Sequence, residues 1–302
     1  MSSPRLQRLL ETRPHARRNL GLTFAGGGNR AFYQLGLLHQ WAERILPRTA
    51  AIAACSAGAC VVTLFLAERE RITRDFWRAR RQHVTKNVDF TRLLRGRGII
   101  PHGRIYRDTL LCAYADGGLQ RIRAQPFPIL IVTAEIPRLM TSTAAALLGF
   151  SAYNLEKRVR RNMVHPTLSR RLGFRPHVVD ARECETPEEL TDLVIASSSS
   201  PPFTPVGRFR GRRLLDGGLI DNVPASAAED VDGVQYNLVM MTRPYPAEVT
   251  GQQGKRLYIA PTVVPPVTAW DYTNPDLIDA TIAQGEREAE LHSPALTALL
   301  AR

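Results

Sequence analysis

The chain has 302 residues, of which 44% are hydrophobic and 23% are charged, so it can bury a core and is not disordered as a whole. Forty lysines and arginines against 28 aspartates and glutamates give a net charge of +12, which favours an anionic partner, either nucleic acid or an acidic membrane surface. The four cysteines show neither C-x-x-C spacing nor clustering with histidines, which argues against a zinc site or a disulfide framework and fits a reducing compartment.

The first residues, MSSPRLQRLLETRPHARRN, are rich in arginine and contain no apolar segment of the kind that a secretory signal needs. We expect residues 1–18 to form a flexible basic arm and residues 19–302 to form a single domain. The absence of a signal predicts a cytoplasmic protein, with peripheral contact to a membrane as the alternative that the positive charge leaves open.

Residues 49–67 form the one stretch that is long enough and free enough of charge to resemble a membrane span. Its first part, AAIAA (50–54), is typical of a buried strand, and Ser56-Ala57-Gly58 then interrupts the apolar stretch before a second apolar run. A strand, a sharp turn and a buried helix explain this pattern better than one continuous transmembrane helix does.

The order of the predicted elements indicates an α/β fold. A strand over 19–24, a glycine-rich turn and an amphipathic helix are followed by a strand over 50–54 and a helix over 57–66, a βαβα opening that predicts a parallel sheet. Further strands are predicted over 127–134, 176–180, 213–216, 234–241 and 256–259. The stretch 69–125 predicts an arginine-rich helical insertion, and 274–291 predicts the last helix of the domain.

Ser56 occupies the turn between the second strand and its helix, and this position predicts a nucleophile. A serine on a sharp strand-to-helix turn is exposed at the carboxyl edge of the sheet, and its neighbours must be small because backbone segments approach closely there. Ala54, Ala57 and Gly58 meet that requirement. The alternative is a serine at an ordinary helix start in the core.

The loop AGGGNR, residues 25–30, follows the first strand and so lies at the same edge of the sheet as Ser56. Gly26, Gly27 and Gly28 would let backbone amides face a ligand, as an oxyanion hole requires, and Arg30 would add a positive charge. A competing interpretation is a dinucleotide site, because Gly26-x-Gly28-x-x-Ala31 fits that fingerprint. The acidic residue that such a site needs at the end of the second strand is missing, since that strand ends in Cys55-Ser56.

Asp216 is the candidate base, because it ends an apolar strand and is followed by Gly217 and Gly218, which let another backbone approach its carboxylate. The same letters, DGGL, begin at Asp116, where a helix-like stretch precedes them and a helix cap is the better interpretation. A histidine triad would need His292, the one histidine after Asp216, which we place beyond the last helix. We therefore favour a serine–aspartate dyad.

Together these motifs resemble those of the patatin-like phospholipase family. The oxyanion-loop motif is matched by Gly26, Gly27, Gly28 and Arg30, the nucleophile motif by Ser56 and Gly58, and the aspartate motif by Asp216, Gly217 and Gly218. The segments ASSSSPPFTPV (196–206) and WDYTNPD (270–276) are also similar to the family's sequences. Ala31 and Ala54 replace glycines of the family pattern, and each adds a methyl group where close packing is expected.

The resemblance implies a three-layer α/β/α fold with a mostly parallel central sheet. It further implies a dyad of Ser56 and Asp216 that cleaves phospholipids or other lipid esters through an acyl-enzyme, with no metal and no cofactor. A catalytically silent lipid-binding protein with the same fold is the alternative. Neither the head group, the acyl position nor any protein activator can be inferred.

Two groups of arginines are candidates for contact with an anionic membrane surface. Arg71, Arg74, Arg78 and Arg81 share one face of a predicted helix, which would lie either on lipid or over the core as a solvated face. The second group comprises Arg158, Arg160, Arg161, Arg170 and Arg171. Nucleic acid is the weaker alternative, because no binding module and no interleaved aromatic residues accompany these charges.

Overall fold

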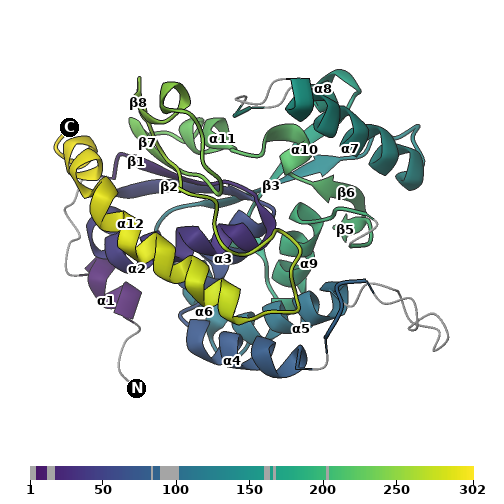
Figure 1. The fold of residues 1–302 in the computed structure, drawn as a ribbon, viewed down its shortest axis with the longest axis horizontal. Helices are drawn as coiled ribbons and strands as arrows, with labels where there is room; N and C mark the ends of the chain where they lie inside the picture. The colour runs from purple at the N-terminus through teal and green to yellow at the C-terminus, as the bar shows by residue number, and fades with distance from the viewer. Residues whose placement is uncertain are drawn as a thin grey trace.

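The computed structural model describes residues 5–11, 18–82, 84–88, 102–159, 164–165, 168–201 and 204–302. A mostly parallel sheet lies between helices, so the chain has the α/β/α architecture that its sequence predicts (Figure 1). The strands are β1 Leu20–Phe24, β2 Thr49–Cys55, β3 Ile129–Glu135, β4 Arg175–Asp180, β5 Gly207–Phe209, β6 Arg212–Asp216, β7 Tyr236–Met240, β8 Gly251–Gln253 and β9 Arg256–Ile259.

Twelve α-helices lie in the described part of the chain. They are α1 Arg5–Glu11, α2 Phe32–Ile45, α3 Ala57–Leu66, α4 Glu70–Arg80, α5 His102–Tyr114, α6 Gly118–Arg123, α7 Ser142–Val159, α8 Leu168–Arg171, α9 Pro187–Ser197, α10 Gly218–Asp221, α11 Ala225–Glu229 and α12 Asp276–Leu300. Short 3-10 turns add η1 Gly28–Ala31, η2 Leu46–Arg48, η4 Ala181–Glu183 and η5 Ala247–Val249.

The strands follow the order β5-β6-β3-β2-β1-β7-β9-β8, and β4 also pairs with β3. The five strands from β3 to β9 in this order are mutually parallel, whereas β4, β5, β6 and β8 pair in the antiparallel sense. Every residue of β1 is buried, as expected for a central strand of a parallel sheet with helices on both faces.

Alternation along β2 explains how the two helical layers attach. Ile52 and Ala54 join the main core together with side chains of α2, α3 and α9, whereas Ala51 and Ala53 pack against Ala228 of α11 on the other face. Figure 1 shows α2, α3 and α12 on one side of the strands and the short helix α11 on the other. Because the strands from β3 to β9 are parallel, their carboxyl ends lie along one edge of the sheet.

The last helix is longer than the sequence predicts. We expected it to end at Leu291, but α12 continues to Leu300 and contains Pro294. A proline removes one backbone donor, and tertiary packing here outweighs that loss, because Leu296 and Leu299 beyond it are buried in the main core. His292 accordingly lies within the helix and not beyond it.

The segment expected as a flexible arm is in part ordered. Arg5–Glu11 forms α1, Leu6 is buried in the main core, and the Leu6 amide donates to Glu68 Oε1 at 2.9 Å. Residues 1–4 and 12–17 lie outside the described residues.

The arginine-rich stretch 69–125 contains the helices α4, α5 and α6 and no strand in its described part, residues 69–82, 84–88 and 102–125. Two short strands, β5 and β8, and the five helices α7 to α11 were not predicted from the sequence. Residues 49–67 form β2, the turn at Ser56 and α3. Among the described residues, no helix combines the length and the apolar character that crossing a bilayer requires.

Candidate active site

Ser56 lies at a strained turn between β2 and α3. Its backbone angles are φ 51° and ψ −132°, a left-handed conformation that costs a non-glycine residue about 1–3 kcal/mol and that the surrounding structure must impose. Two contacts hold it: the Ser56 amide donates to Ser197 Oγ at 2.8 Å, and that hydroxyl donates to the Val132 carbonyl at 2.6 Å. The turn therefore has the geometry of a nucleophile elbow.

The small residues around the turn are needed for close backbone contact. A Cβ atom at Gly58 would lie 2.5 Å from the Phe24 carbonyl oxygen and 2.7 Å from that of Ala25. Ala31 and Ala54, the two departures from the family pattern, are both fully buried in core clusters. Their methyl groups are accommodated, and the turn at Ser56 keeps its strained form.

Asp216 reaches Ser56 because two strands share one edge of β3. Cys55, at the end of β2, pairs with Val132, and Asp216, at the end of β6, pairs with the next residue, Thr133. Strand β4 pairs with β3 along its other edge, over Leu130–Glu135, so β2 and β6 must both lie on the remaining edge. Because β2 is parallel and β6 antiparallel to β3, the carboxyl ends of β2 and β6 face each other there. The residues that follow the two strands are thereby brought into contact.

Gly217 makes this junction possible. A Cβ atom there would overlap the Val132 carbonyl oxygen and lie 2.9 Å from Cys55 Cβ, so only glycine fits between the ends of the two strands. This close approach of another backbone is the role predicted for Gly217 from the sequence.

The Asp216 carboxylate accepts three hydrogen bonds. Ser56 Oγ donates to Oδ2 at 2.8 Å, Ser200 Oγ donates to the same oxygen at 3.0 Å, and the Gly218 amide donates to Oδ1 at 2.8 Å. Burial raises the pKa of Asp216, because it disfavours the charged carboxylate, and the three donors oppose that rise. The carboxylate is thus a stronger base than an exposed aspartate and lies within reach of the serine proton.

The glycine-rich loop divides into an anchor and two free donors. The Gly26 amide donates to the Asn222 carbonyl at 3.0 Å, and the Gly26 carbonyl accepts from Asn222 Nδ2 and Thr242 Oγ1. Gly26, expected in the oxyanion hole, is therefore committed to the scaffold. The amides of Gly27 and Gly28 make no hydrogen bond to other residues that the structure describes, and both line the cavity in front of Ser56.

Arg30 lines the same cavity, as expected, and its Nε atom is buried without a hydrogen-bond partner among the described residues.

Gly28 has φ 58°, and a Cβ atom there would overlap the carbonyl of Ala269, so this position requires glycine. The Asn29 amide donates to the same carbonyl at 3.0 Å, which fixes the end of the loop.

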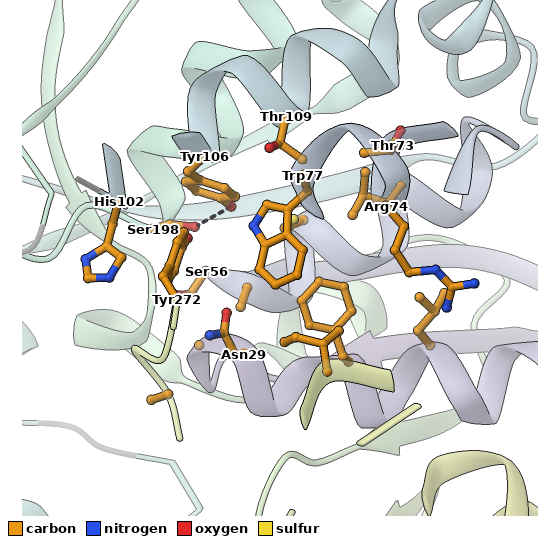
Figure 2. Close-up of a pocket in the computed structure, with 18 of the residues that line it drawn as sticks. Asn29, Ser56, Thr73, Arg74, Trp77, His102, Tyr106, Thr109, Ser198 and Tyr272 are labelled. Carbon is orange, nitrogen blue, oxygen red and sulfur yellow. Dashed lines mark hydrogen bonds between the residues drawn. The ribbon is translucent and has the colours of Figure 1, made fainter. Parts of the chain in front are cut away.

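Two cavities meet at Ser56. The wider one, of about 540 Å³, contains Asp216, the glycine loop, Arg30 and Arg243. The second is a slot of about 90 Å³, several times the roughly 10–15 Å³ that one water needs, and its walls are largely apolar. In Figure 2, Trp77 lies between Ser56 and Arg74 in this slot, and the Tyr106 hydroxyl forms a 3.2 Å hydrogen bond with Ser198 Oγ.

A profile of the patatin-like phospholipase family matches residues 22–229 of the chain, which include both Ser56 and Asp216. The chain belongs to the patatin-like phospholipase family. Among solved structures, VipD from Legionella pneumophila is similar, with 12% sequence identity and a TM-score of 0.45, over 94% of this chain and 67% of that chain. No curated protein sequence matches the chain.

No histidine is bonded to the serine or the aspartate of this patatin-like site in the described residues. His292 lines neither cavity; it contacts the backbone of Ala260, and burial lowers its pKa. His102, which the sequence analysis did not consider, lines the slot, but it bonds to Asn87 at 3.2 Å and stacks edge-on against Tyr272. Burial lowers the pKa of His102 to about 4, so its ring is neutral at pH 7.

The second DGGL sequence lies far from this chemistry. Asp116 follows α5, its side chain is exposed, and it pairs with Arg69 at 2.9 Å. Gly117 has φ 90° and precedes α6. Residues 115–117 form the predicted turn after α5, whereas Gly118 is the first residue of α6.

Three of the four arginines on the predicted face of α4 contact other parts of the protein, whereas Arg71 is exposed. Arg74 and Arg78 form ion pairs with Asp279 of α12, and Arg81 is buried with its guanidinium 4.2 Å from the centre of the Trp77 ring. Asp279 could not be predicted as a partner, because it lies on a helix some 200 residues later in the chain. In this patatin-like fold Arg74 and Arg78 join α4 to α12 and are not free to bind lipid.

No individual role was predicted for three serines that contribute to the site. Ser197, Ser198 and Ser200 lie in the serine-rich segment whose likeness to the family was noted, but their partners are fixed by the tertiary fold. The cluster of consecutive serines before the aspartate strand was the available signal.

Proposed function

We propose that this protein is a lipid acyl hydrolase of the phospholipase A or lysophospholipase type in which Ser56 and Asp216 form the catalytic dyad. The observation that carries the proposal is the 2.8 Å hydrogen bond from Ser56 Oγ to Asp216 Oδ2 at the junction of two cavities. Membership in a family of lipid acyl hydrolases supports the reaction class.

In the proposed reaction, Ser56 Oγ attacks the ester carbonyl while its proton passes to Asp216 Oδ2. Negative charge then develops on the carbonyl oxygen, and the amides of Gly27 and Gly28 would stabilise it. Asp216 returns the proton to the departing alcohol, which leaves an acyl group on Ser56. Water, deprotonated by Asp216, attacks this acyl-enzyme and releases the fatty acid and the free serine.

The two cavities suggest how a lipid ester would lie. The apolar slot suits the acyl chain, because its walls include Phe32, Leu35, Leu64 and Ile278. The wider cavity suits the polar part of the lipid, because Arg30 and Arg243 line it and would attract a phosphate group. We propose a phospholipid at an anionic membrane surface as the substrate on these grounds.

The direct test is the release of fatty acid from vesicles that contain several phospholipid classes. We expect the wild type and Ser226→Ala, an exposed serine on α11, to release fatty acid equally, and Ser56→Ala to lose activity by about 10³-fold or more. Equal rates for the wild type and Ser56→Ala would refute the proposal. Inactivity of both, with lipid binding retained, would favour the catalytically silent lipid-binding protein.

A further inference from the structure

Exposed apolar side chains concentrate on and beside α7, at the upper right edge of the fold in Figure 1. Leu147 is 67% exposed, Leu155 is 58% exposed, and Leu139 just before the helix is fully exposed. Leu148 and Val159 add to the same face. Large apolar side chains so exposed and so close together mark an interaction site more often than chance.

The three sides of α7 have different environments. Ala145, Ala146 and Ala152 are buried, and the second core cluster fixes the helix on the fold. Phe150 and Tyr153 line the wide cavity in front of Ser56, and Asn154 lines the cavity while also being exposed. The exposed leucines therefore adjoin the wall of the substrate cavity.

The surrounding sequence carries most of the protein's excess charge. Residues 136–179 contain eight arginines and lysines and a single acidic residue, which gives +7 of the total of +12. That acid, Glu156, is buried and accepts a hydrogen bond from the Leu168 amide at 2.9 Å, which ties α8 to α7.

The arginines around α7 remain available to a partner. Arg138 precedes the helix, Arg158 lies on its exposed side, and Arg170 and Arg171 lie on α8. All four are exposed, and none forms an ion pair within the part of the chain that the structure describes. Arg74 and Arg78 of α4, by contrast, form ion pairs with Asp279 of α12. Arg160 and Arg161, of the same sequence cluster, lie outside the described residues.

We propose that the α7 surface, formed by Leu139, Leu147, Leu148, Leu155, Arg138, Arg158, Arg170 and Arg171, docks the protein onto an anionic lipid bilayer. Leucines at the surface of a helix insert into the boundary between head groups and acyl chains, and neighbouring arginines bind anionic head groups. A protein partner of the same charge as this chain would be repelled, which argues against a second copy here. The bilayer would then face the mouth of the cavity that contains Ser56.

The inference rests on the proposed function only in that docking would bring the active site to its lipid substrate. The docking itself requires no catalysis. The test measures binding of the full chain to sedimented vesicles of phosphatidylcholine, with and without phosphatidylglycerol. Leu147→Ser with Leu155→Ser is compared with Leu291→Ser, because Leu291 of α12 is also 67% exposed. Arg170→Gln with Arg171→Gln tests the charge.

We expect the leucine pair variant to lower the vesicle partition coefficient by about tenfold or more, and Leu291→Ser to change it less than about twofold. The arginine pair variant should weaken binding to vesicles with phosphatidylglycerol and leave the weak binding to phosphatidylcholine alone unchanged. Hydrolysis of a soluble butyryl ester should be the same for all these variants, because none of the changed residues lines the cavities.

Three results would overturn the inference. The first is wild-type protein that does not bind the anionic vesicles, and the second is a leucine pair variant that binds them as the wild type does. The third is a Leu291→Ser variant that loses as much vesicle binding as the leucine pair variant. A wild-type dimer in sedimentation equilibrium that the leucine pair variant converts to monomer would assign the surface to a second copy instead. Failure of the proposed function is distinct, because it would appear as absent ester hydrolysis with vesicle binding intact.

Discussion

Ser200 Oγ lies 3.0 Å from Asp216 Oδ2, the same oxygen to which Ser56 donates from 2.8 Å. A donor to a carboxylate favours its charged form, so Ser200 lowers the pKa of Asp216 against the rise that burial causes. Ser200→Ala removes that donor and should raise the pKa of Asp216 further. Asp216 must be ionised to accept the serine proton. When the pH is lowered, the variant should therefore lose activity at a higher pH than the wild type does.

The measurement is the pH dependence of kcat/KM for a soluble ester in the wild type and Ser200→Ala. The acidic limb of the wild type should lie above the ordinary aspartate range of about 4, and that of the variant should lie higher still. An acidic limb that moves to lower pH in Ser200→Ala would contradict the assignment of Asp216 as the base.

Asp216→Asn should separate activity from stability. Activity should fall by about 10³-fold or more, since the base is lost. The pKa of Asp216 is raised in the fold, so its contribution to stability is present below the pKa of the unfolded chain and is lost as pH rises through the folded value. At pH 7 the neutral asparagine should therefore give an unfolding temperature equal to or above that of the wild type, in thermal denaturation followed by circular dichroism. A clear drop at pH 7 would mean that the carboxylate stabilises the fold.

Gly58→Ala should destabilise the protein by about 2–4 kcal/mol in denaturant unfolding, because its methyl group would press on the backbone carbonyls of Phe24 and Ala25. Gly103→Ala is the matched control: it also lies in a helix, and its Cβ atom would meet nothing closer than 3.8 Å, at Pro205. The control should be neutral or slightly stabilising. Equal effects of the two substitutions would show that β1 does not approach α3 as described.

Leu64→Phe should shorten the acyl chain that the enzyme prefers. Leu64 lies two turns beyond Ser56 on α3, about 12 Å along the helix axis, and lines the apolar slot. We expect kcat/KM to fall about tenfold or more for a dodecanoyl ester and to stay within about twofold for a butyryl ester. A uniform loss for both esters would instead indicate that the slot does not hold the acyl chain.

The positions of Ser56 and of the glycine-rich loop were predictable, because each motif follows a strand that is recognisable from the local sequence. In a parallel sheet the residues that follow neighbouring strands lie at the same edge. Ser56 and the glycine loop follow neighbouring parallel strands, and their convergence at one sheet edge follows from that order alone. The ends of most strands agree with the sequence within one or two residues, since apolar runs flanked by glycine or proline mark them well.

The antiparallel placement of β6 could not be predicted in the same way. Nothing local to Asp216 indicates that its strand shares an edge of β3 with β2, since this depends on long-range pairing. The bonds of Gly26 to Asn222 and of Ser200 to Asp216 join segments that only the tertiary fold brings together. Pro294 inside α12 is a similar case, where packing against the core overrides a local helix-breaking signal.

The most direct test of the central claim is labelling of the intact protein with a fluorophosphonate, followed by mass spectrometric mapping of the modified residue. The probe reacts with a serine only when its hydroxyl is activated, so we expect modification at Ser56 in the wild type and labelling at least about 100-fold slower in Asp216→Asn. Modification at another serine, or labelling of Asp216→Asn at the wild-type rate, would contradict the assignment of Ser56 and Asp216 as nucleophile and base.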